Sequence, residues 1–197
     1  QSIIMGGDIQ GDAVVSSANL SIAYADAFRT NFASATGVCT VISPTSPPDS
    51  NSGVWFVRLG SPLTAGLRNL PELPTGWRYE GWVVQPAAGS GVTYLSTGKF
   101  ARADSADLDG AGPYAGNAGQ PLNFPGQDFI QGLRIPNLLT TGYAFMVSLE
   151  PVPDNAPEPF FLRLLQSQPI GASASRVQTL NNVIDSTAPK GKVTIRR

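Results

Sequence analysis

The sequence lacks histidine altogether and contains a single cysteine, Cys39. Without an imidazole there can be no Ser-His-Asp or Cys-His catalytic machinery and no histidine metal ligand. One cysteine excludes an intramolecular disulfide, a cysteine-based zinc site and a cysteine-ligated iron–sulfur cluster. We interpret Cys39 as a small buried hydrophobic residue.

Charge is also scarce. Of the 197 residues 14% are charged, and the formal net charge is −1. A chain with so few lysines and arginines offers no strongly basic surface for binding nucleic acid. No apolar run approaches the length of a transmembrane helix. We therefore expect neither a nucleic-acid partner nor insertion into a membrane.

Small and turn-forming residues are abundant instead, with 21 glycines and 17 prolines. The chain is long enough to bury a substantial core. This composition, with few charges, favours an all-β, turn-rich extracellular domain. The sequence begins at Gln1 rather than Met, which we interpret as a mature secreted chain. We expect it to be extracellular or on the cell surface.

The strongest strand signals lie between residues 53 and 166. Residues 77–84 are aromatic and β-branched, residues 92–100 form a second strand with a bulge expected at Gly98, and residues 143–150 form a third. Turn residues and prolines bound each of them. The fold class that this pattern predicts is an antiparallel β-sandwich. Residues 103–128 read as a long ordered loop, a feature that is usually functional or part of an assembly surface.

The flanking segments are interpreted as extended arms. The Pro- and Ser-rich residues 43–53 give the clearest boundary, so we divide the chain into an N-terminal arm with strands (1–52), a core (53–166) and a C-terminal arm (167–197). Residues 13–24 are expected to form a strand and 25–34 a short helix or loop. The end of the C-terminal arm alternates as a half-buried edge strand does.

Several motifs in the core resemble one known family. Leu73–Val84, Ser96–Phe100 and Phe145–Asn155 resemble the extracytoplasmic domain of anti-sigma-K-type factors, above all its free-standing secreted bacterial form. The most specific pieces are Tyr79-Glu80-Gly81-Trp82 and Ser148-Leu149-Glu150-Pro151. The resemblance covers about residues 53–166 and implies a β-sandwich outside the cytoplasm. It does not imply sigma-factor binding, which in that family belongs to a separate cytosolic domain.

Three aspartates form the densest cluster of hard oxygen ligands. Asp104, Asp107 and Asp109 precede Gly110 on the long loop. Calcium takes six to eight oxygens, and closely spaced aspartates on a Gly-rich loop can supply several of them. The spacing is not that of an EF-hand, and the alternative is a solvated turn with Asx caps. Calcium is the one cofactor for which the sequence offers ligands.

Paired carboxylates are also what glycoside hydrolysis requires, and Glu80 and Glu150 are the candidates. The alternative is that each satisfies backbone or arginine donors at the end of a strand, and on that reading the protein is not an enzyme. The aromatic residues Trp55, Trp77, Tyr79 and Trp82 could form a sugar platform, but their positions inside strands favour packing in the core.

The terminal segments give the leading hypothesis. An extended segment can join the sheet edge of a neighbouring molecule through main-chain hydrogen bonds. The candidate donors carry apolar residues near both ends of the chain, namely Gln1, Ile3, Ile4, Met5, Val193 and Ile195. We predict a non-enzymatic secreted subunit that polymerises with itself into a filament or sheath. The alternatives are that both arms fold back on their own sandwich, or that a monomeric binding or sensing module uses the 103–128 loop.

Overall fold

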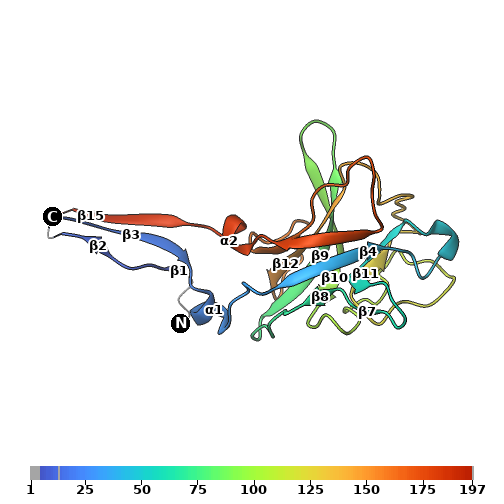
Figure 1. The fold of residues 1–197 in the computed structure, drawn as a ribbon, viewed down its shortest axis with the longest axis horizontal. Helices are drawn as coiled ribbons and strands as arrows, with labels where there is room; N and C mark the ends of the chain where they lie inside the picture. Colours follow the sequence, from blue (N-terminus) through green and yellow to red (C-terminus); the bar gives the residue numbers. More distant parts are fainter. Residues whose placement is uncertain (1–4, 13, 197) are drawn as a thin grey trace.

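The computed structural model describes residues 5–12 and 14–196 and shows a protein that is nearly all β (Figure 1). Every strand pairing in it is antiparallel. The α-helices are short, α1 (Tyr24–Phe28) and α2 (Ile184–Thr187). Within the described ranges, no helix is long and apolar enough to cross a membrane. The all-β prediction is confirmed.

Nine strands make up the main sheet of the body. Along the sheet their order is β10 (Val92–Phe100), β9 (Trp77–Pro86), β12 (Ala144–Pro151), β13 (Arg163–Gln166), β14 (Val177–Asn182), β4 (Thr36–Val41), β5 (Gly53–Trp55) and β11 (Gly126–Asp128), with β8 (Leu67–Arg68) also paired to β4. A separate two-stranded ladder joins β6 (Val57–Arg58) to β7 (Thr64–Ala65). The body is therefore built mainly from one large sheet.

This sheet curls until its two edge strands approach each other. Gln127 on β11 donates a hydrogen bond from Nε2 to the carbonyl oxygen of Ser96 on β10, at 2.9 Å. The sheet is thus nearly closed, and its inner face surrounds the core. Alternate residues of the central strands, such as Tyr79 and Val83 on β9 and Phe145 on β12, are fully buried there. Burying a side chain of this size contributes about 2 kcal/mol to folding.

The expected strands and the expected bulge are present. The register of β10 against β9 shifts between Ser96 and Lys99, and Gly98 between them has φ +103°, a conformation that side chains with a Cβ rarely adopt. The long loop is present but ends earlier than expected: residues 101–125 contain no strand or helix, whereas residues 126–128 of the expected 103–128 loop form β11, which pairs with β5.

The body extends beyond the expected core of residues 53–166 at both ends. β4 lies before it and β14 after it, and the two pair with each other in the middle of the main sheet. This pairing could not be predicted from the sequence, because a ladder between residues 36–41 and 177–182 depends on long-range contacts and has no local sequence pattern.

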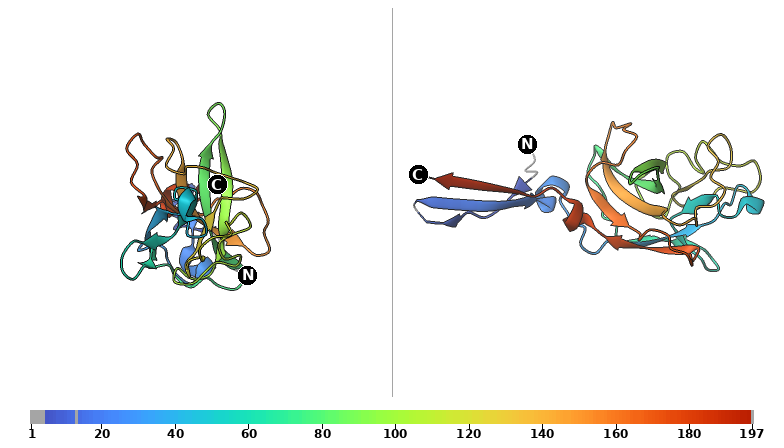
Figure 2. Two further views of the ribbon diagram at one scale, coloured as in Figure 1. Left: turned by 90° about the vertical axis from the view of Figure 1, so that its right-hand side faces the viewer. Right: turned by 90° about the horizontal axis from the view of Figure 1, so that it is seen from above.

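The two ends of the chain form a second, smaller sheet. Its central strand is β3 (Val15–Ile22), with β15 (Gly191–Arg196) on one side and the short β1 (Met5–Gly6) and β2 (Gln10–Gly11) on the other. We call this sheet the arm. It projects from one end of the body, with α1 and α2 at its base (Figures 1 and 2).

A buried carboxylate joins three segments of the body. Asp128 on β11 is fully buried and accepts hydrogen bonds from the Thr45 amide (2.9 Å), the Thr45 hydroxyl (2.6 Å) and Trp55 Nε1 on β5 (2.8 Å). Its loss would leave these buried donors without partners, and each unpaired buried donor costs about 1–3 kcal/mol.

We expect Asp128→Ala to lower the free energy of unfolding by about 3 kcal/mol, because it leaves Thr45 and Trp55 donors unsatisfied. Urea unfolding followed by tryptophan fluorescence measures the effect. Glu158→Ala, at an exposed position, is the control and should change stability by less than about 0.5 kcal/mol. Equal stability of the two variants would contradict this account of the network.

Candidate functional site

The pairing of the arm strands sorts their side chains into two faces. Opposed residues in an antiparallel ladder lie on the same face, so Val193 lies beside Ala18 and Ile195 beside Ser16. Met5 lies opposite Ile22 on the same face. This apolar face comprises Met5, Ala18, Leu20, Ile22, Val193 and Ile195.

The opposite face is polar and partly basic. Lys192 lies beside Asn19, Thr194 beside Ser17, and Arg196 beside Val15, which is the one large apolar residue among these pairs. Strict alternation along β15 thus separates apolar from polar residues. Such alternation is typical of a sheet that is covered on one face and solvated on the other.

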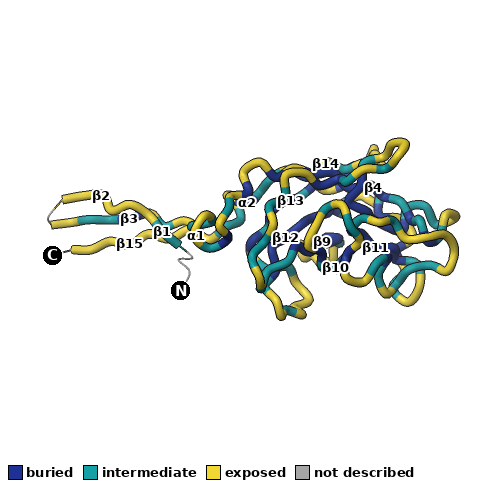
Figure 3. Tube along the Cα trace, turned by 90° about the horizontal axis from the view of Figure 1, so that it is seen from below, coloured by how far each residue is buried: buried dark blue, intermediate teal, exposed yellow. Residues whose placement is uncertain are grey.

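Nothing within the described residues covers the outer part of the apolar face. Val193 and Ile195 are 46% and 49% exposed, and every residue of β15 is exposed. Figure 3 shows β15 and β2 as exposed along their lengths, in contrast to the strands of the body. The expectation of a half-buried edge strand was therefore only partly right: β15 is an edge strand, but all its residues are exposed, because it pairs with β3 away from the body.

The expected donor segments are paired within the chain. Val193 and Ile195 belong to β15, and Met5 to β1, and both strands pair with β3. Gln1, Ile3 and Ile4 lie outside the described residues. The two arms thus form neither free single strands nor an extra layer on the body. They make one sheet, in which β15 is paired on one side only as far as the described residues go.

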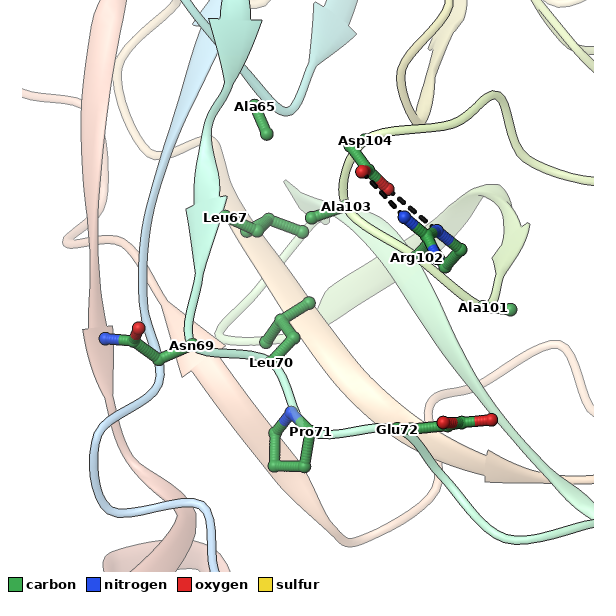
Figure 4. A pocket seen from close by; sticks show the side chains of 10 residues that line it. All are labelled: Ala65, Leu67, Asn69, Leu70, Pro71, Glu72, Ala101, Arg102, Ala103 and Asp104. Carbon is green, nitrogen blue, oxygen red and sulfur yellow. Dashed lines mark hydrogen bonds and ion pairs between the residues drawn. The ribbon is translucent and has the colours of Figure 1, made fainter.

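The three aspartates of the expected calcium cluster do not come together as one group. Both carboxylate oxygens of Asp104 accept hydrogen bonds from Arg102, at 2.9 and 2.8 Å. This pair lies at the rim of a hollow of about 510 Å³, which Leu67, Leu70 and Glu72 also line (Figure 4). Within the described part of the chain, no three histidine, cysteine or acidic residues are grouped as metal ligands.

Asp107 and Asp109, by contrast, meet at the bulge of β10. A Cβ placed on Gly98 would lie 2.7 Å from Asp107 Oδ2 and 2.5 Å from Asp109 Oδ1. Burial is the main reason that the pKa of Asp107 is raised; the Gly126 amide opposes the rise, and the Asp109 carboxyl adds to it. The structure therefore retains two of the three predicted ligands as a pair.

Glu80 and Glu150 are buried and engaged by neighbouring donors. Ser96 donates to Glu80 at 2.5 Å, and Lys99 Nζ lies 3.6 Å from the second oxygen of Glu80. Glu150 accepts hydrogen bonds from the Phe160 amide, at 2.9 Å, and from the Ser148 hydroxyl. Both carboxylates are thus enclosed by donors. Glu150 accepts a backbone amide near the end of β12, as expected, whereas Glu80 lies inside β9 and is engaged by serine and lysine side chains rather than by backbone or arginine donors at a strand end.

The environment of Glu150 opposes its ionisation. Burial raises the pKa of Glu150 to about 7, although the hydrogen bonds from Ser148 and Phe160 counteract this. The same Ser148 hydroxyl accepts a hydrogen bond from Trp82 Nε1 at 2.8 Å. The network therefore links β9, β12 and the segment that precedes β13.

The strand tryptophans pack in the body rather than form an exposed platform. Trp55 and Trp82 are almost completely buried, and so is Tyr79. Trp77 is half-buried and its ring lies edge-on to Phe28 of α1, with centroids 4.9 Å apart. The prediction of core packing for these aromatics is confirmed.

Comparison with known proteins adds no relative. No family model, curated protein or solved structure matches this chain. The functional argument therefore depends on the geometry of the chain itself.

We expect the protonation of Glu150 to make stability depend on pH. Folding raises the pKa of the Glu150 carboxyl from 4.5 to about 7, so the folded state favours the protonated form. The contribution of this group to the free energy of unfolding is therefore fully present below pH 4.5. The contribution is lost as the pH rises through about 7 and amounts to about 3 kcal/mol. Glu150→Gln keeps a neutral group at this position. The free energy of unfolding of the wild type, minus that of Glu150→Gln, should therefore fall between pH 4.5 and 8. A constant difference, measured by urea unfolding across this range, would show that Glu150 does not titrate there.

Proposed function

We propose that this protein is a non-enzymatic, secreted structural subunit that assembles with itself into a filament or sheath. The arm of one copy packs on the next copy. The observation that carries this proposal is the uncovered apolar face of the arm, at Val193 and Ile195.

A small sheet with one exposed apolar face needs a second layer. Sheets of few strands gain stability mainly by packing that face against something. The arm projects from the body, so its own body does not supply the layer (Figure 2). Covering half-exposed Val193 and Ile195 would contribute about 1 kcal/mol for each side chain. A second copy of the chain is the occupant that we propose.

One strand edge supports a directional contact. Among the described strands β15 pairs only with β3, whereas β10 in the main sheet is approached by Gln127 and Leu108, which donate hydrogen bonds to its Ser96 and Lys99 carbonyls. An edge strand can accept another strand through main-chain hydrogen bonds. Because the arm and the body are different surfaces, a contact between the arm of one copy and the body of the next is heterologous, and heterologous contacts that do not close give open filaments.

The alternative is a monomeric binding or sensing module that uses the 103–128 loop. A pocket of about 260 Å³ favours it. The lining includes Trp82 and Tyr94 from β9 and β10, and Asp109 and Tyr114 from the loop. A monomeric protein with this pocket would keep its ligand when the arm is altered.

We expect wild-type protein to form assemblies, and the double substitution Val193→Asp/Ile195→Asp to raise the concentration for half-assembly by more than about tenfold. The two carboxylates would have to be desolvated in the contact. Light scattering together with negative-stain imaging at neutral pH measures both the size and the form of the particles.

Thr194→Asp is the matched control, since it adds the same side chain to the same strand on the opposite face. It should assemble as the wild type does. Fluorescence of the buried Trp55 and Trp82 verifies that the body of each variant is folded. A wild-type protein that remains a monomer of 20.7 kDa at all concentrations would overturn the proposal.

A further inference from the structure

The Asp107–Asp109 pair lacks a positive partner in the described part of the chain. Asp107 is only 9% exposed. Its Oδ2 accepts the Gly126 amide at 3.0 Å, but its Oδ1 is buried with no hydrogen-bond donor. None of the ion pairs formed by the described residues includes Asp107 or Asp109. The nearest lysine in sequence, Lys99, is directed to Glu80 and to the Asp154 carbonyl.

A buried carboxylate next to a second one is costly unless a cation compensates both. Asp107 is held in place by two backbone contacts: Gly126 donates to its side chain, and the amide of the next residue, Leu108, donates to the Lys99 carbonyl at 2.9 Å. Asp109 is exposed and lies at the surface beside it. The pair therefore has one fixed inner ligand and one outer ligand facing solvent.

Two glycines allow these side chains to approach the backbone closely. A Cβ at Gly98 would collide with both carboxylates. A Cβ at Gly112, which has φ +82°, would collide with the side-chain amide of Gln127. The bulge of β10 thus accommodates the aspartate pair, and the turn after Asp109 accommodates Gln127, which lines the same pocket as Asp109.

Asp109, the outer member of the pair, also borders a space that water can occupy. Asp109 and Gln127 line the pocket of about 260 Å³, together with Trp82, Tyr94 and Tyr114. Gln127 Nε2 donates a hydrogen bond to the Ser96 carbonyl. The side-chain oxygen of Gln127 is thus left as an acceptor in the wall of the pocket. Two carboxylates, an amide oxygen and water are the hard ligands that calcium takes in six- to eightfold coordination.

We propose that Asp107 and Asp109 bind one calcium ion at the β10 bulge, with Gln127 as an additional oxygen ligand and water from the pocket completing the shell. Asp104 is not part of this site, because Arg102 engages both of its oxygens. The site is separate from the apolar face of the arm, so it can be tested whether or not the protein polymerises.

The test uses the full-length chain, freed of metal with a chelator and titrated with calcium. For an affinity typical of extracellular calcium modules, a tenfold excess over the dissociation constant should raise Tm by about 3 °C. Terbium should replace calcium and show luminescence on excitation of the nearby Trp82, Tyr94 and Tyr114, and added calcium should displace it.

The variants separate a metal site from a pair that merely shares a proton. Asp107→Asn and Asp109→Asn should fold without calcium but lose the shift in Tm and the terbium emission. Asp104→Asn is the matched control and should keep both. The proposal is overturned if wild-type protein shows neither signal up to 10 mM calcium (roughly ten times the weakest affinity of such modules). It is equally overturned if Asp104→Asn loses the signals as the other two variants do, or if Asp107→Asn and Asp109→Asn retain them.

Discussion

The six-residue ladder between β3 and β15 is the constraint on which the shape of this protein depends. It joins Val15 to Arg196 and Leu20 to Gly191, residues from opposite ends of the chain. Closing so long a loop costs conformational entropy that only the completed ladder and the packed body can offset. Because both ends are fixed to each other, the arm leaves the body as a unit rather than as two independent strands, and its alternation produces one continuous apolar face.

The body depends on a comparable pairing between β9 and β12. The two most specific pieces of the resemblance to anti-sigma-K-type factors lie on these strands, and Ser148 is directly opposite Glu80. One face of the two strands belongs to the main core, while the other carries a small polar network that includes Trp82, Ser148 and Glu150. The resemblance itself stays a prediction. The geometry accounts for the acidic residues of these motifs without catalysis, because each is enclosed by donors from neighbouring segments.

Local features of the sequence were predictable, and long-range contacts were not. The strands at 77–86 and 144–151 follow from aromatic and β-branched residues, and the bulge at Gly98 from a glycine inside a strand pattern. The insertion of β4 and β14 into the main sheet has no local signature, because pairing partners 140 residues apart in sequence cannot be read from either strand. That Asp104 does not join the other two aspartates could have been predicted, because Arg102 lies two residues away and can pair with its carboxylate. Nothing in the sequence groups Gln127 with Asp109, because the two residues line one pocket only through the closure of the sheet.

In the assembly that we propose, the distribution of charge on β15 favours one face of the arm as the contact surface. Charged residues on an edge strand usually oppose uncontrolled pairing with other strands, and β15 carries Lys192 and Arg196. Both side chains lie on the face opposite Val193 and Ile195. A neighbour that covers the apolar face therefore leaves the two cations in water and avoids their desolvation. A neighbour that packs on the polar face would have to bury them. In the assembly that we propose, the apolar face would supply the binding free energy, and main-chain hydrogen bonds to the outer edge of β15 would fix the register of the contact.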